Sequence, residues 1–123
     1  YASPNMSAYC SSKAAVVRLT EGLAMELAQT NVHVNALGPG TIHTRLLEEI
    51  QYAYDAAGDK MTSGGWGSME QAADLALFLA SGDSGSLSGR LISAVLDDFS
   101  NLPERIPEIM ESHIYQLRRV ELP

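Results

Sequence analysis

Tyr9 and Lys13 are the residues whose types and spacing point most directly to chemistry. They lie four positions apart near the start of an Ala-rich, helix-forming segment, so both side chains reach the same side of a helix. An ammonium close to a phenol favours the phenolate form. Such a phenol can give a proton to a carbonyl oxygen or take one from an alcohol. Tyr–Lys pairs at this spacing are also common as solvated neighbours, so the pair alone leaves both interpretations open.

The segments that must position this pair begin with a long helix and a strand. Residues 8–29 are good helix formers with a broad apolar stripe, and Ser7 is the expected N-cap. The breadth of the stripe predicts that the helix is covered on more than one side, by a sheet and by a partner subunit. Residues 30–40 alternate in polarity and predict a short buried strand, which the Gly-Pro-Gly turn of residues 38–40 ends.

An excursion and a second helix follow. Residues 41–67 are irregular, with a short helix expected at 44–56 and a Gly/Ser-rich loop after it. Residues 68–81 predict a helix, because Ser68 with Gln71 three positions later makes a capping box and the apolar residues recur at helical spacing.

A second strand and a charged tail complete the chain. Residues 90–98 predict a strand, and the helix between two apolar strands indicates a parallel sheet covered by helices. Residues 99–123 predict a charged tail with one short helix at 104–112 or longer, read as a solvated end. Asp97 and Asp98 resemble a paired-carboxylate site, but neighbours on a strand point to opposite faces, which argues against a joint role.

Composition narrows the function classes. A chain of 123 residues suits one domain, and its net charge of −7 argues against nucleic-acid partners and an anionic membrane surface. Apart from Cys10 there is no cysteine, which excludes an internal disulfide or a multi-cysteine metal site and fits a reducing, cytoplasmic location. No apolar run approaches the roughly 18–20 residues of a membrane span. The chain begins with Tyr1 rather than Met, so we expect a piece of a longer protein.

The joint order and spacing of several motifs resembles the short-chain dehydrogenase/reductase family. The family's Y-x-x-x-K is followed, at the family's distance, by V-N-x-x-x-P-G and then by a threonine. The sequence "LSGRLISAV" stands where the family has its T-G-x-x-x-x-V strand, and the resemblance covers residues 1 to about 98. The matching positions are Tyr9, Lys13, Val34, Asn35, Pro39, Gly40 and Thr44.

The resemblance implies a fold and a reaction. The fold class is α/β, a Rossmann-type doubly wound parallel sheet of which this chain supplies the C-terminal part: residues 1–98 belong to that domain, and 99–123 form the tail. The implied reaction transfers a hydride between NAD or NADP and a small-molecule carbonyl or alcohol. By the same resemblance Tyr9 is the general acid/base, and Lys13 holds the nicotinamide ribose and assists Tyr9.

Cofactor and substrate positions follow from the same resemblance. Pro39 and Gly40 would shape the cofactor loop 38–44, and the backbone of Ile42 and the side chain of Thr44 would meet the nicotinamide carboxamide. The excursion 45–67 would be the substrate lid. Candidate substrate contacts within it are Tyr52 and Trp66, with Tyr54 and Met61 as further apolar residues that pack or bind.

The chain also departs from the family pattern. The Gly-rich T-G-x-x-x-G-x-G turn, the N-A-G segment and the active-site serine are absent, and Ser3 and Ser7 lie too close to Tyr9 to replace that serine. All three belong to the family's N-terminal half, so we expect this chain to be the C-terminal half of a longer protein and to be inactive alone. The residue that selects NAD or NADP is then missing too.

Two alternatives stay open. An epimerase or dehydratase acting on a nucleotide sugar uses the same scaffold and Tyr–Lys pair, although it needs a longer C-terminal end. The second alternative is a non-catalytic oligomerisation module, because helix 8–29 is apolar enough to pair with its copy in a homodimer or homotetramer. No residue pattern in the chain predicts a metal site.

Overall fold

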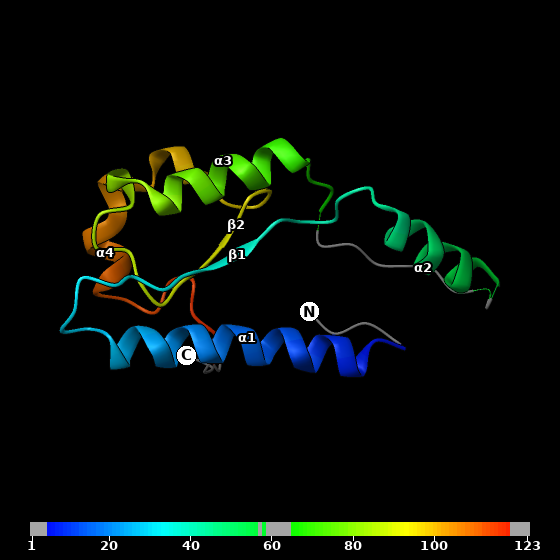
Figure 1. Ribbon diagram of the computed structural model, residues 1–123, viewed down its shortest axis with the longest axis horizontal. Coiled ribbons are helices and arrows are strands. Elements are labelled where there is room, and N and C mark those ends of the chain that lie inside the picture. The colour runs from blue at the N-terminus through cyan, green and yellow to red at the C-terminus, as the bar shows by residue number, and fades with distance from the viewer. Residues whose placement is uncertain (1–4, 57, 59–64, 119–123) are drawn as a thin grey trace, which may run out of the picture.

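The computed structural model describes residues 5–56, 58 and 65–118 and shows helices around a small parallel sheet (Figure 1). The order of elements is helix, strand, helix, helix, strand and short helix, which confirms the predicted order. Short 3₁₀ turns follow α3 and precede α4. The elements are α1 (Ser7–Glu26), β1 (Ala36–Gly38), α2 (Arg45–Ala56), α3 (Met69–Ala80), β2 (Leu91–Ser93) and α4 (Ile106–Met110).

The sheet is parallel and has helices on both faces. β1 and β2 pair in parallel with Leu37 opposite Ile92, as a helix-containing crossover requires. In Figure 1 α3 lies on one face of the strands and α1 on the other, which is the layering of a doubly wound fold. Within the described residues β1 pairs with β2 alone, so its other edge is open.

Both strands are shorter than the sequence predicts. Before β1, the backbone of Val34 is used by the loop that precedes β2: its N–H donates to Ser88 Oγ and its carbonyl accepts from Gly89 N–H. The Asn35 side chain bonds the same loop at Leu87 O and Arg90 N–H. These residues are therefore tied to a loop rather than to a strand.

After β2 the chain turns instead of extending to residue 98. Asp97 Oδ2 accepts the Ser93 N–H at 2.7 Å, and Asp98 bonds the Asn101 side chain at 2.6 Å. The two carboxylates therefore serve separate turns. The predicted strand over 90–98 is wrong beyond Ser93, and so is the strand geometry on which the opposite-face argument rested.

Helix ends follow local signals at α3 but not at α1. Ser68 accepts from Gln71 N–H while the Gln71 side chain accepts from Ser68 N–H, which confirms the predicted capping box. Ser7 is not the N-cap of α1, because Met6 occupies that position and makes no side-chain bond. α1 also ends at Glu26 rather than at 29, and turns follow it.

The core lies on the α3 side of the sheet, and α1 is largely uncovered. Leu19 is 61 % exposed, and only Thr20 and Glu21 of α1 are buried within the described residues. The expected cover on a second side of α1 stays a prediction. The core residues come from α3, β2, α4 and the connecting turns: Leu75, Leu87, Ile92, Ala94, Leu102, Ile106 and Ile109.

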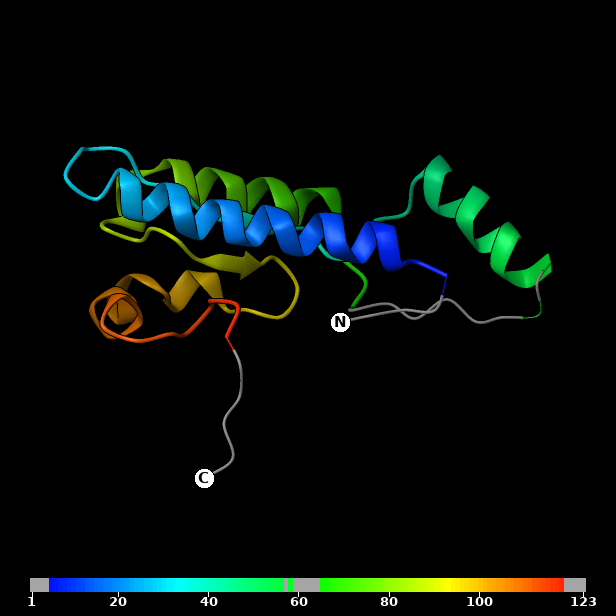
Figure 2. The same cartoon turned by 90° about the horizontal axis from the view of Figure 1, so that it is seen from below.

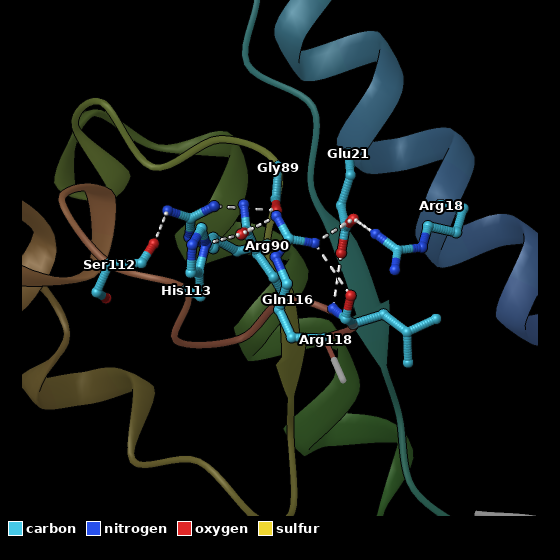
Figure 3. A network of polar contacts seen from close by, with 9 residues as sticks. Arg18, Glu21, Gly89, Arg90, Ser112, His113, Gln116 and Arg118 are labelled. Atoms are coloured by element: carbon cyan, nitrogen blue, oxygen red, sulfur yellow. Dashed lines mark hydrogen bonds and ion pairs between the residues drawn. The ribbon is translucent and has the colours of Figure 1, made fainter. Parts of the chain in front are cut away.

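The tail packs onto the body of the molecule rather than projecting into solvent. Ile106 and Ile109 are buried in the core, so the expectation of a solvated end is wrong over residues 99–118. A division of the chain at residue 98 stays a prediction. The last described residues return to α1, where Leu117 N–H donates to Glu21 Oε1 at 2.7 Å (Figure 3).

Glu21 and Arg90 hold this docking in place. Glu21 is 7 % exposed. Its carboxylate also forms ion pairs with Arg18 Nη1 at 2.6 Å and with Arg118 Nη1 at 3.2 Å. Arg90 is 4 % exposed, and its Nη2 donates to the carbonyl of Ser112 at 3.1 Å (Figure 3). The same Nη2 donates to the carbonyl of Ile109 at 2.8 Å. The end of α4 is thus satisfied by a buried guanidinium.

The Glu21 contacts predict a stability that falls in acid. Burial by itself would raise the pKa of Glu21, but the Leu117 N–H and the guanidiniums of Arg18 and Arg118 outweigh burial and hold the pKa below its ordinary value. The folded state therefore gains stability above the ordinary carboxyl range and loses it as the pH falls through the lowered pKa.

The protein to use is the one encoded by the whole reading frame that contains this chain, called here the complete gene product. Its thermal unfolding midpoint, measured from about pH 7 to about pH 3, checks this expectation. Glu21→Gln should lower the midpoint at neutral pH and flatten its fall in acid, because the charge that protonation removes is already gone. The matched control is Glu26→Gln at the exposed end of α1. If the midpoint of Glu21→Gln falls with pH as it does in the wild type, Glu21 does not cause the acid sensitivity.

Candidate active site

The Tyr–Lys pair lies on one side of the first turns of α1. Tyr9 is 55 % exposed, and Lys13 Nζ lies 5.5 Å from the centroid of its ring. The ammonium thus sits over the aromatic ring in a cation–π contact. The helix delivers this arrangement by its own geometry, because residues four apart stack on the same face.

The turn after β1 lies at the same end of the molecule as the pair. β1 runs antiparallel to α1, so the C-terminal end of β1 and the N-terminal end of α1 share one end of the fold (Figures 1 and 2). This is the end at which open α/β sheets bind ligands. Gly40 has a φ of +78°, and a Cβ there would clash with Val95 Cγ2, so the turn requires glycine.

Thr44, the predicted carboxamide contact, also caps a helix. Its Oγ1 accepts the Leu47 N–H at 3.3 Å, and its carbonyl accepts the Glu48 N–H, so Thr44 caps α2. A hydroxyl that accepts one hydrogen bond keeps its own proton to donate. Capping therefore leaves Thr44 able to donate to a carboxamide oxygen. Pro39 is exposed and Ile42 is half-buried in the same turn.

The end of the excursion 45–67 is hydrogen-bonded to this turn, which the sequence did not predict. Thr41 N–H donates to Gly65 O at 2.8 Å and Gly67 N–H donates to Thr41 O at 3.0 Å, so Thr41 and Trp66 form a parallel bridge. Val95 fills the space between the two segments. A Cβ on Gly67 would lie 2.5 Å from Pro39 O and 2.8 Å from Val95 Cγ2. The run "GGWG" is the available signal, since small residues mark a close backbone approach.

Both predicted substrate residues line one cavity beside this bridge. Its volume is about 310 Å³, and Tyr52 from α2 and Trp66 from the bridge both line it with much of their side chains exposed. Tyr54 is buried and does not line it. Met61 lies outside the described residues. The other lining residues are His43, Leu47, Glu48, Gln51 and Asp55.

A larger cavity of about 720 Å³ lies away from this end. It opens at the C-terminal half of α1 between Leu27, His33, Gly89 and His113, so it is not near the Tyr–Lys pair. Among the described residues no group of three or more His, Cys, Asp or Glu side chains could hold a metal ion. No helix in the described parts of the chain is long and apolar enough to cross a membrane.

The sequence and the fold both match known proteins. Residues 1–94 match a family model described as enoyl-(acyl carrier protein) reductase. The 3-oxoacyl-[acyl-carrier-protein] reductase FabG of Thermotoga maritima is 38 % identical over 93 residues, which cover 75 % of this chain and 38 % of the relative. The oxidoreductase UcpA of Salmonella typhimurium is 39 % identical over 114 residues, which cover 85 % of this chain and 43 % of the relative.

A solved structure agrees with the sequence matches. A short-chain dehydrogenase family protein from Francisella tularensis superposes with a TM-score of 0.62 and 31 % identity, over 75 % of this chain and 43 % of that structure. The chain therefore belongs to the short-chain dehydrogenase/reductase family, a family of oxidoreductases, and carries part of its Rossmann-type α/β fold. It spans about two fifths of the length of the curated relatives it matches.

Proposed function

We propose that this chain forms the C-terminal part of an NAD(P)-dependent oxidoreductase that interconverts a small-molecule carbonyl and an alcohol. One observation carries the proposal: in a fold of this family, the Tyr9–Lys13 pair lies at the end of the molecule where the Gly40 turn follows β1. Ligands bind at this end of open α/β sheets. Two of the relatives are named as reductases and one as a dehydrogenase, which supports the same class.

In this mechanism Tyr9 is the proton donor to the carbonyl oxygen and the proton acceptor from the alcohol. Lys13, whose Nζ lies beside the Tyr9 ring, holds the ribose hydroxyls of the cofactor through its ammonium donors. When bound, the nicotinamide supplies or accepts the hydride. The proton from Tyr9 then balances the hydride, so a ketone becomes a secondary alcohol and an aldehyde a primary one.

The residues present fit a nicotinamide. Pro39 and Gly40 are both exposed in this turn, so its backbone is open to a ligand. In this proposal the Ile42 backbone and the free proton of Thr44 Oγ1 meet the carboxamide. Tyr52 and Trp66 contact the substrate from the lid cavity.

Further parts of the proposal concern the whole protein. The Gly-rich turn that cradles a pyrophosphate is not in this sequence, so the 123-residue chain by itself should not turn over NADH or NADPH. The exposed apolar residues of α1 support a homodimer or homotetramer formed through this helix. A cytoplasmic location is part of the same proposal, and the preference for NAD or NADP stays open.

A comparison of two samples tests the proposal. The complete gene product is expected to consume NADH or NADPH, followed by absorbance, with simple ketones or β-keto esters. The isolated 123-residue chain should show no consumption above the buffer rate. Turnover by the isolated chain would overturn the expected inactivity, and the absence of turnover by the complete gene product with both cofactors and all substrates would overturn the oxidoreductase proposal.

A further inference from the structure

The loop of residues 87–90, which precedes β2, contacts both elements that carry the candidate active site. Gly89 N–H donates to Val34 O at 2.7 Å, and Ala36 N–H donates to Arg90 O at 2.8 Å, so the loop is tied to the start of β1. β1 leads into the turn with the expected cofactor contacts. On its other side the loop contacts α1, which carries the expected proton donor. The loop therefore sets the position of one element relative to the other.

The contact between this loop and α1 is made at Gly89, which is buried and has a φ of +70°. Gly89 lies beside Glu21 of α1 (Figure 3), and a Cβ on Gly89 would lie 3.9 Å from Glu21 Cα. The same Cβ would lie 3.1 Å from Ala24 Cβ, which is closer than an ordinary van der Waals contact, so α1 or the loop would have to move by a few tenths of an ångström. The absence of a side chain at Gly89 therefore sets how closely α1 approaches the loop.

A shift at this contact grows along the helix. Glu21 holds α1 next to the contact, because its carboxylate accepts the Leu117 N–H at 2.7 Å. Ala24 lies three residues after Glu21, and Tyr9 lies twelve residues before it. Because a helix rises evenly along its axis, a tilt about Glu21 displaces Tyr9 roughly four times as far as Ala24. A few tenths of an ångström at Ala24 become about 1 Å at Tyr9, a misplacement that can cost about a hundredfold in rate.

We propose that Gly89 is a positioning residue for the reaction: through Ala24 it sets where Tyr9 lies relative to the turn after β1. The inference rests on the proposed function and concerns a residue of the loop before β2, outside the candidate site itself. Within the described residues only Thr20 and Glu21 of α1 are buried, so this helix is attached to the rest of the chain close to Gly89.

Adding one methyl group at Gly89 tests the proposal in the complete gene product. With ethyl acetoacetate as substrate, Gly89→Ala should lower kcat by about ten- to a hundredfold. The solvent deuterium isotope effect on kcat should rise, because a misplaced Tyr9 makes proton transfer slower. A fraction of unfolded protein would lower kcat without changing this isotope effect, so the two measurements together separate misplacement from loss of fold.

A second substitution should restore the rate without restoring the stability. The double variant Ala24→Gly/Gly89→Ala removes the methyl group that the new Cβ would meet, so kcat should return to within about threefold of the wild type. The strained φ stays and a glycine is added to a helix, so the unfolding midpoint should remain below that of the wild type.

The matched control is Gly85→Ala, which also places a side chain at a positive φ, +50°. A Cβ there would lie 3.6 Å from Ile106 Cδ1 and would have no atom of α1 within 4 Å. This variant should lower the unfolding midpoint and keep kcat. If Gly89→Ala does not fold, Ala24→Val adds methyl groups from the opposite side of the same contact and should lower kcat in the same way.

The outcomes separate this inference from the proposed function. Wild-type kcat in Gly89→Ala (or in Ala24→Val, where it replaces that variant) would overturn the positioning role and leave the oxidoreductase proposal intact. A double variant as slow as Gly89→Ala, or a Gly85→Ala variant that is equally slow, would do the same. The absence of turnover by the wild-type complete gene product would overturn both.

Discussion

Replacing Tyr9 with Phe is expected to lower kcat of the complete gene product by about a thousandfold, which corresponds to about 4 kcal/mol of transition-state stabilisation. The substitution removes the hydroxyl that would exchange the proton and keeps the ring over which Lys13 Nζ lies at 5.5 Å. General acid–base groups typically contribute factors of about 10²–10⁴, so the expected loss lies within that range.

Cofactor binding separates this effect from misfolding. The dissociation constant of the nicotinamide cofactor, measured by fluorescence, should change by less than about threefold in Tyr9→Phe, because the expected ribose contacts come from Lys13. The matched control is Tyr115→Phe, which removes a hydroxyl on the tail and should retain kcat. If Tyr9→Phe keeps most of its kcat, Tyr9 is not the proton donor.

Replacing Arg90 with Met should destabilise the complete gene product by about 3 kcal/mol or more, since each buried polar group left without a partner costs about 1–3 kcal/mol. Met retains the apolar stem but leaves the carbonyls of Ile109 and Ser112 without their donor. Burial lowers the pKa of Arg90, as does the charge of Arg118, but a guanidinium stays protonated. The unfolding midpoint should fall by roughly 6–12 °C for a protein of about 150–250 residues.

The control for this prediction is Arg105, an exposed arginine of the tail to which Arg90 binds. Arg105 pairs with Glu108 at 3.0 Å with both side chains about half exposed, and such pairs contribute less than about 1 kcal/mol. Arg105→Met should therefore shift the midpoint by no more than a few degrees. Equal midpoints in the Arg90 and Arg105 variants would show that Arg90 does not stabilise the tail.

Local signals in the sequence predicted helices better than strands. The N-terminal end of α3 follows from Ser68 and its capping box, which a few neighbouring residues specify. β1 and β2 are shorter than their apolar runs because strand residues need partners. Val34 and Asn35 find theirs in the loop before β2, a pairing that no local pattern reveals.

In the candidate site, too, short-range features were predictable from the sequence and long-range contacts were not. The Tyr9–Lys13 spacing and the Gly40 turn are short-range features, so their positions at one end of the fold were predictable. The cavity between Tyr52 and Trp66 and the docking of Leu117 on Glu21 depend on residues far apart in sequence. Periodicity and composition carry no information about such contacts.

The bridge between Thr41 and Trp66 makes the excursion a segment with both ends fastened. Whatever lies between these two points can differ in length or sequence at small entropic cost while the Gly40 turn keeps its conformation. Under the proposed function, substrate range and cofactor binding can therefore change separately, because α2 can be replaced while Thr41 and Trp66 keep their bridge.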